Sequence, residues 1–157
     1  MTERDRTPDG RPRNARPRDA LGRPLPPGED GVERVPEDLD LDIEETVSEG
    51  QRLLDRGYPF HAHEVFEAMW RKAPPEERPL WQGLAQLAVG MTHLLRGNPK
   101  GAASLLRQGK ARIRHYEDVP PYRLDIDGLS AWADHLLTEI DRGDPTDAPP
   151  IPILRMP

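Results

Sequence analysis

Apolar residues recur three to four positions apart along the middle of the chain, which is the spacing of one face of an α-helix. Glycine followed closely by proline ends several of these periodic segments, as expected where one helix stops and the next begins. The pattern predicts helices over residues 41–56, 60–72, 76–96, 99–116 and 127–142. We therefore expect an all-α fold, a compact orthogonal or antiparallel bundle of five helices.

The predicted helix over residues 76–96 is apolar around almost its whole circumference. Residues 79–95 contain no Asp, Glu, Lys or Arg. A helix without a charged face is normally surrounded by other helices, so we expect this one to be the buried centre of the bundle. Its polar residues Gln82, Gln86 and His93 favour a buried helix over a membrane span. The short turn at residues 97–99 predicts an antiparallel hairpin with the following helix.

Two extensions of different composition flank a helical domain that we place at residues 39–143. Residues 1–38 are rich in Arg, Pro, Asp and Gly without a sustained helical or strand period. Such a segment buries too little apolar surface to offset its ordering entropy, so we expect a disordered tail. Residues 144–157 are too rich in proline for a helix or the interior of a sheet. Their apolar side chains, candidates to lie in a surface groove, are Ile151, Ile153 and Leu154.

Charge and composition narrow the class of protein. The chain has no cysteine, which excludes disulfides and thiolate metal sites. Residues 29–49 carry ten acids, whereas residues 78–116 carry seven Lys or Arg and no acid. We interpret this asymmetry as attraction between the first and fourth helices, because a nucleic-acid surface usually needs a stronger basic excess with aromatic residues on it. No signal-peptide pattern opens the sequence, so we expect a cytoplasmic protein with no membrane association.

Two of the predicted helices carry polar stripes on otherwise apolar surfaces: His63, Glu67 and Trp70 on one, Gln82, Gln86 and His93 on the other. Each stripe keeps to one side of its helix at about 100° per residue. Because buried polar groups must find partners, we predict that the stripes face each other. The expected result is a buried network of His63, Glu67, Gln86 and His93, with Trp70 as one wall. His61 and Glu64 point elsewhere and are expected to be exposed.

Three interpretations of the two stripes are open. They form a hydrogen-bonded network that fixes helix packing, or a pocket for a small polar molecule, or a metal or acid–base site. In the third case His63, Glu67 and His93 are the candidate ligands of an open zinc or iron site. The segment is not H-E-x-x-H, since Glu67 stands where the second His would be. No nucleophile is evident; Thr92 is the nearest hydroxyl, on a different face.

These observations favour a binding or interaction module over an enzyme, with the polar seam between the second and third helices as its site. The partner is an unknown small molecule or protein. The sequence requires no cofactor and assigns no catalytic residue, and a divalent metal fits the third interpretation alone. A metal-dependent or acid–base enzyme using His63, Glu67 and His93 is the alternative.

The same residues resemble a known family. They resemble the domain-of-unknown-function family 309 (DUF309) of small all-helical bacterial and archaeal proteins. The resemblance lies in Phe60, Ala62, His63, Glu64, Glu67 and Trp70 and in the segment WQGLAQLAVGMTHLLRGNPKGAASLL that follows them. The family pattern is a His, three residues, a Glu, two residues and a Trp. The resemblance extends over about residues 45–140 and implies a compact helical fold. It implies no activity, and it leaves the choice between packing and ligand binding open.

Overall fold

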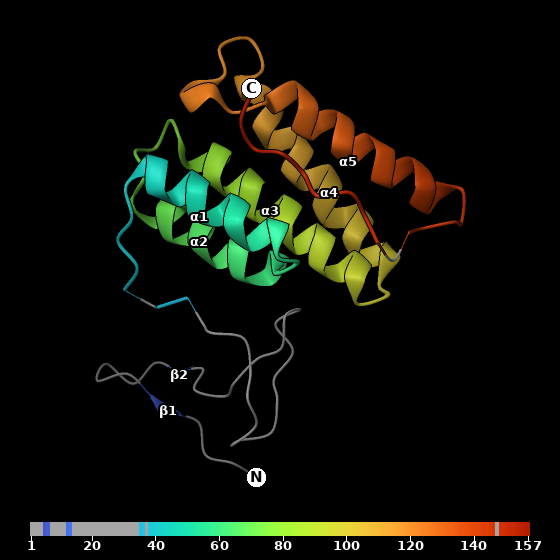
Figure 1. The fold of residues 1–157 in the computed structure, drawn as a ribbon, viewed down its shortest axis with the longest axis horizontal. Helices are drawn as coiled ribbons and strands as arrows, with labels where there is room; N and C mark the ends of the chain where they lie inside the picture. Colours follow the sequence, from blue (N-terminus) through green and yellow to red (C-terminus); the bar gives the residue numbers. More distant parts are fainter. Residues whose placement is uncertain (1–4, 7–11, 14–34, 37, 147) are drawn as a thin grey trace.

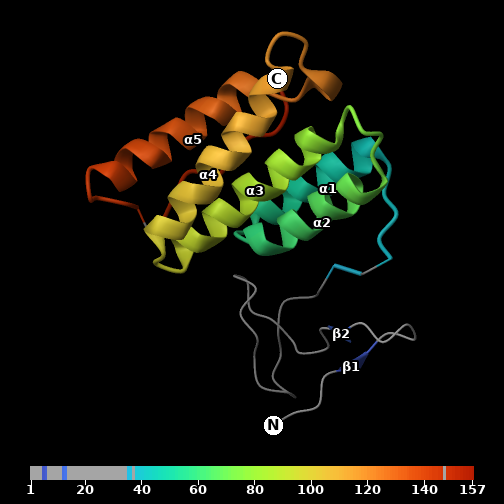
Figure 2. The same ribbon diagram turned by 180° about the vertical axis from the view of Figure 1, so that it is seen from behind.

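The fold was analysed in a computed structural model that describes residues 5–6, 12–13, 35–36, 38–146 and 148–157 (Figures 1 and 2). Within these residues the domain is built from five α-helices: α1 (Ile43–Asp55), α2 (Pro59–Lys72), α3 (Arg78–Leu95), α4 (Pro99–Ile113) and α5 (Ile126–Asp141). Two single turns of 3₁₀ helix, Arg114–Tyr116 and Pro121–Arg123, connect α4 to α5. The all-α, five-helix prediction is confirmed.

Two short segments of the N-terminal tail, where no regular structure was expected, pair as strands. β1 (Asp5–Arg6) and β2 (Pro12–Arg13) are antiparallel, with Asp5 opposite Arg13. The other residues before position 35 lie outside the described residues. The predicted disorder of the tail therefore stays a prediction.

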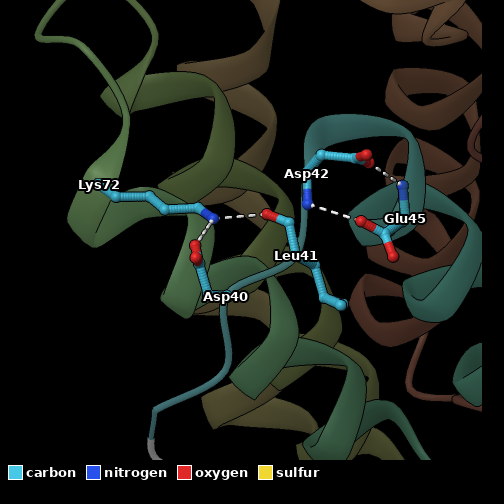
Figure 3. A network of polar contacts seen from close by, with 5 residues as sticks. All are labelled: Asp40, Leu41, Asp42, Glu45 and Lys72. Atoms are coloured by element: carbon cyan, nitrogen blue, oxygen red, sulfur yellow. Dashed lines mark hydrogen bonds and ion pairs between the residues drawn. The ribbon is translucent and has the colours of Figure 1, made fainter.

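Local capping explains where α1 begins and how it is joined to α2. The Asp42 carboxylate accepts a hydrogen bond from the Glu45 backbone N–H at 2.7 Å, and the Glu45 side chain accepts one from the Asp42 N–H at 3.2 Å. This reciprocal pair satisfies two N–H groups that a helix start leaves free. Lys72, at the end of α2, donates to the Asp40 carboxylate and to the Leu41 carbonyl (Figure 3). The end of α2 is thereby tied to the segment that leads into α1.

The core is centred on α3, which packs against α2 on one side and α4 on the other (Figures 1 and 2). Leu80 and Trp81 are fully buried, and most of the helix is buried with them. A Cβ placed on Gly109 of α4 would lie 2.8 Å from the Gly83 carbonyl oxygen of α3, so the two backbones approach closely because both positions are glycine. The predicted central helix and antiparallel hairpin are confirmed.

Two further expectations concern membrane-spanning helices and the C-terminal segment. Among the described residues, none of the helices is both long and apolar enough to cross a membrane. The C-terminal segment lies against the helices with Leu154 buried, as expected. Ile151 and Ile153 instead point outward, with 40% and 61% of their surface exposed. Both are more exposed than Leu154 because an extended chain turns alternate side chains to opposite sides, although Ile153 still lines a surface hollow beside α1.

Candidate functional site

One contact shows how the ends of α2 and α3 meet. The Arg96 guanidinium, just after α3, lies 5.9 Å from the centre of the Phe60 ring in the first turn of α2. The end of α3 therefore lies beside the start of α2, so the two packed helices are antiparallel. His63, one turn after Phe60, and His93, one turn before Arg96, lie toward the same end of the two helices.

The half-exposed positions of both helices coincide with the two predicted polar stripes. Between positions 80 and 94 of α3, the half-exposed residues are Gln82, Gln86, Val89 and His93, and the others are buried. On α2 the half-exposed residues include Phe60, His63, Glu67 and Trp70. We call the six predicted residues of these stripes the α2–α3 seam: His63, Glu67, Trp70, Gln82, Gln86 and His93. The seam reaches the surface, whereas the sequence analysis placed it in the interior.

His63 and Glu67 form the best-defined contact of the seam. The His63 Nε2 atom lies 3.2 Å from a carboxylate oxygen of Glu67, and the Nδ1 atom is hydrogen-bonded to the Phe60 carbonyl. The Phe60 and His63 rings are 4.7 Å apart. An imidazolium, which donates from both nitrogens, satisfies both oxygen acceptors at once. The imidazole is therefore held in one orientation by its own helix.

The Glu67 carboxylate is stabilised in its charged form. The hydrogen bond from His63 lowers the pKa of Glu67 most; partial burial opposes this by raising the pKa, and the charges of His63 and Arg71 lower it further. Arg71 lies 3.5 Å from the second carboxylate oxygen. The side chains of His63 and Glu67 are 17% and 36% exposed, so a ligand can reach this charge from solvent.

The two remaining polar groups of α3 have partners away from α2. The Gln86 amide donates to the Gln108 side chain of α4 at 3.2 Å. The His93 Nδ1 atom lies 3.2 Å from the side-chain nitrogen of Asn98, the residue that caps α4. Burial, and secondly the charge of Arg96, lowers the pKa of His93. The predicted continuous network is thus divided into separate pairs. His63 and Glu67, two residues of the predicted network, pair with each other, whereas Gln86 and His93 pair with residues outside it.

The metal candidates are not gathered into a ligand cluster. Among the residues that the structure describes, no group of three or more His, Cys, Asp or Glu side chains is arranged to hold a metal ion. His63 and His93 lie toward the same end of α2 and α3, but the hydrogen-bond partners of His93 Nδ1 and His63 Nε2 are Asn98 and Glu67. The role of His63, Glu67 and His93 as metal ligands has no support from this arrangement.

His61 is a residue that the sequence analysis placed wrongly. It was expected to be exposed, but it is fully buried, with the Tyr58 and Phe60 rings centred 6.0 and 5.8 Å from its own. Val65 and Met69, one and two turns further along α2, are buried on the same side. The spacing of four between these three residues was the available signal. Glu64 is half-buried rather than exposed, and one of its carboxylate oxygens is shielded from solvent.

A hollow beside α1 was not predicted. Its volume is 490 Å³, and it lies between the segment that precedes α1 and the faces of α1 and α2. Its walls combine apolar side chains such as Leu39, Leu53 and Val65 with the acidic Glu45 and Glu49. The sequence patterns could not indicate it, because it depends on where residues 35–41 run.

Comparisons with known proteins show a family that part of the helical segment resembles. Residues 47–105 match the family described as domain of unknown function DUF309, and this match includes all six seam residues. The resemblance predicted from the sequence is confirmed for this segment. The uncharacterized protein YpuF of Bacillus subtilis (strain 168) is 42% identical over 65 residues. That alignment covers 38% of this chain and 37% of the length of the relative. No solved structure matches this chain.

Proposed function

With residues 47–105 assigned to DUF309, we propose that the chain is a binding module whose ligand surface is the α2–α3 seam. The observation that carries this proposal is the His63–Glu67 pair, which has a fixed geometry and lies in a half-exposed stripe of α2. Pre-oriented polar groups lower the ordering cost of binding.

The side chains of the seam define the class of ligand. Glu67 offers a carboxylate to an N–H donor, and Gln82 offers an amide that both donates and accepts hydrogen bonds. Phe60 and Trp70 are half-exposed aromatic groups at either end of the α2 stripe, suited to the flat face of a ring. We infer that the ligand is a small polar molecule with a planar ring and at least one N–H donor.

Binding is favoured over catalysis by the surroundings of the pair. Thr92, the nearest hydroxyl in the sequence, is 1% exposed and donates to the Ala88 carbonyl at 2.9 Å, so the helix itself uses it. The scattered positions of the metal candidates give the metal-dependent alternative no support. The domain limits at residues 39–143 and a cytoplasmic location remain proposals that rest on the sequence.

A fragment screen by protein-observed NMR tests the proposal. The probes are small planar amides and nucleobases at about 1 mM, a concentration suited to weak initial ligands. We expect shift changes to concentrate on the Trp70 indole, the Gln82 side-chain amide and the backbone around Glu67. Probes that shift these signals should lose their effect on the Glu67→Gln variant. A screen without any seam response, or with responses that persist in that variant, would overturn the proposal.

A further inference from the structure

The C-terminal residues 149–157 form an extended strap that crosses the helices (Figure 1). The side chain of Gln51 on α1 holds the strap backbone twice: its amide nitrogen donates to the Pro152 carbonyl at 3.0 Å, and its oxygen accepts from the Leu154 N–H at 2.9 Å. Trp132 on α5 donates from its indole nitrogen to the Pro150 carbonyl at 2.7 Å. Two helices thus bind the strap through its main chain.

The far end of the strap is held as a short strand. The Asp125 N–H donates to the Leu154 carbonyl at 2.7 Å, and the Met156 N–H donates to the Arg123 carbonyl at 2.9 Å. These bonds flank an antiparallel bridge between Leu124 and Arg155. Main-chain contacts of this kind are how many domains bind extended peptides.

Specific contacts come from three side chains of the strap. Leu154 is 3% exposed and, with the buried Pro152, packs among apolar residues of α1, α3 and α5. Arg155 pairs with Glu44 at the start of α1. Ile151 and Ile153 stay largely exposed and contribute less to this fit, although Ile153 borders a hollow beside α1. The groove therefore selects an extended segment with the order Pro, any residue, Leu, Arg.

We propose that this groove is a docking site for a partner protein that presents an extended Pro-x-Leu-Arg segment, and that the strap is its tethered occupant. The groove binds main-chain groups, one Leu, one Pro and one Arg, and a segment supplied by another protein offers the same groups. Residues 142–148 link α5 to the strap, and residues 142–145 of this linker are all exposed. Gly143 in this linker has a φ of 74°, a conformation that glycine adopts without strain.

A hollow beside the strap explains how a partner competes with the tethered segment. A short tether gives the strap an effective concentration on the order of mM, so a competing segment needs additional contacts. A volume of 470 Å³ lies between the strap and α1, lined among others by Val47, Ser48, Asp55 and Ile153. A partner segment whose side chain at the position of Ile153 fills this hollow gains contacts that the strap does not make.

The test is a fluorescence-polarisation titration of the labelled peptide PPIPILRMP, the sequence of residues 149–157, into the full chain. Leu154→Asp places a charge in the Leu position of the tethered strap and releases it. We expect the peptide to bind this variant at least about tenfold more tightly than it binds the wild-type chain. Adding Gln51→Ala to Leu154→Asp removes two hydrogen bonds and should weaken peptide binding by about tenfold.

Control measurements separate docking from misfolding. Gln108→Ala, a change of an exposed glutamine on α4, should leave peptide binding to the Leu154→Asp chain unchanged, and a peptide with Asp in the Leu position should not bind. Circular dichroism verifies that each variant is folded. If Leu154→Asp unfolds the chain, hydrogen exchange of the wild-type chain replaces it: excess peptide should speed exchange at the Leu154 and Met156 amides. No binding to a folded Leu154→Asp chain, binding insensitive to Gln51→Ala, or unchanged exchange would overturn the proposal.

Discussion

The His63 imidazole and the Glu67 carboxylate lie 3.2 Å apart on a face of α2 that stays within reach of solvent, and the Phe60 carbonyl fixes the other ring nitrogen. A second pair with the same spacing, His135 and Glu139 on α5, lies 3.1 Å apart. The second pair lies on α5, outside the α2–α3 seam. It therefore serves as an internal control for the properties that we assign to the first.

The charge of Glu67 makes a testable contribution to the pH dependence of stability. Its pKa is lowered from the ordinary value of 4.5, chiefly by the hydrogen bond from His63. A carboxyl with a lowered pKa in the folded state stabilises the fold above its unfolded pKa, and this contribution is lost as pH falls through the folded pKa. We expect carboxyl-carbon NMR to show Glu67 titrating below 4.5.

The matching variant is His63→Ala. Removing the hydrogen bond and the charge of His63 should bring the pKa of Glu67 back toward its ordinary value, because the opposing effect of burial remains. The loss of stability of this variant should be smaller as pH falls below 4.5. A Glu67 titration that does not move in His63→Ala would contradict the hydrogen-bonded pair.

His93 is expected to titrate below its ordinary value of 6.5, because burial disfavours its charged form and Arg96 adds to the effect. The neutral form is then favoured in the folded state, so its contribution to stability is present above 6.5 and is lost as pH falls through the folded pKa. Ring-proton NMR measures the pKa directly. Arg96→Gln should raise it in part; no rise would mean that burial acts alone.

The exposure of Glu67 sets a limit on its role in stability. A half-exposed ion pair is worth about 0.2–1 kcal/mol, against about 1–3 kcal/mol for a group in a buried network. We therefore expect Glu67→Ala and the control Glu139→Ala to destabilise the chain by similar small amounts in urea unfolding. A loss of more than about 2 kcal/mol for Glu67→Ala alone would indicate that the buried network exists after all.

His61 should matter more for stability than any exposed histidine. Its side chain is fully buried between aromatic rings, so truncation leaves a cavity in the core. We expect His61→Ala to cost about 2–4 kcal/mol of unfolding free energy. The same change at the exposed His115 should stay within about 0.5 kcal/mol. Equal effects of the two variants in thermal or chemical unfolding would refute the assignment of His61 to the core.

The fold was predictable because its signals are local and repeated. The apolar circumference of α3 required neighbours on both sides, and the Gly-Asn-Pro turn after it required an antiparallel hairpin. Capping residues such as Asn98 marked the helix starts. The period of the apolar residues shows whether a helix lies on the surface or in the core, and this was enough to predict the arrangement of the helices.

The site was predicted less completely, because a stripe at the edge of a packed face has the same spacing as one at its centre. The six seam residues were predicted from the sequence to face each other in the interior as one network. The partners Gln108 and Asn98 lie on α4 or its cap, and helix periodicity does not reveal which neighbour a border residue contacts. The strap likewise depends on Gln51 and Trp132, residues distant in sequence that no motif connects.

The central claim is that the α2–α3 seam binds a ligand through Glu67. The most direct test makes the same Glu→Gln change at two positions, one inside the seam and one outside it. The dissociation constant of the tightest-binding probe from the fragment screen is measured by NMR titration for the wild-type chain, Glu67→Gln and Glu139→Gln. Losing a hydrogen bond to a charged carboxylate should weaken binding to Glu67→Gln by about tenfold or more. Glu139→Gln should bind like the wild-type chain. Equal affinity of all three proteins, or equal losses in both variants, would contradict the claim.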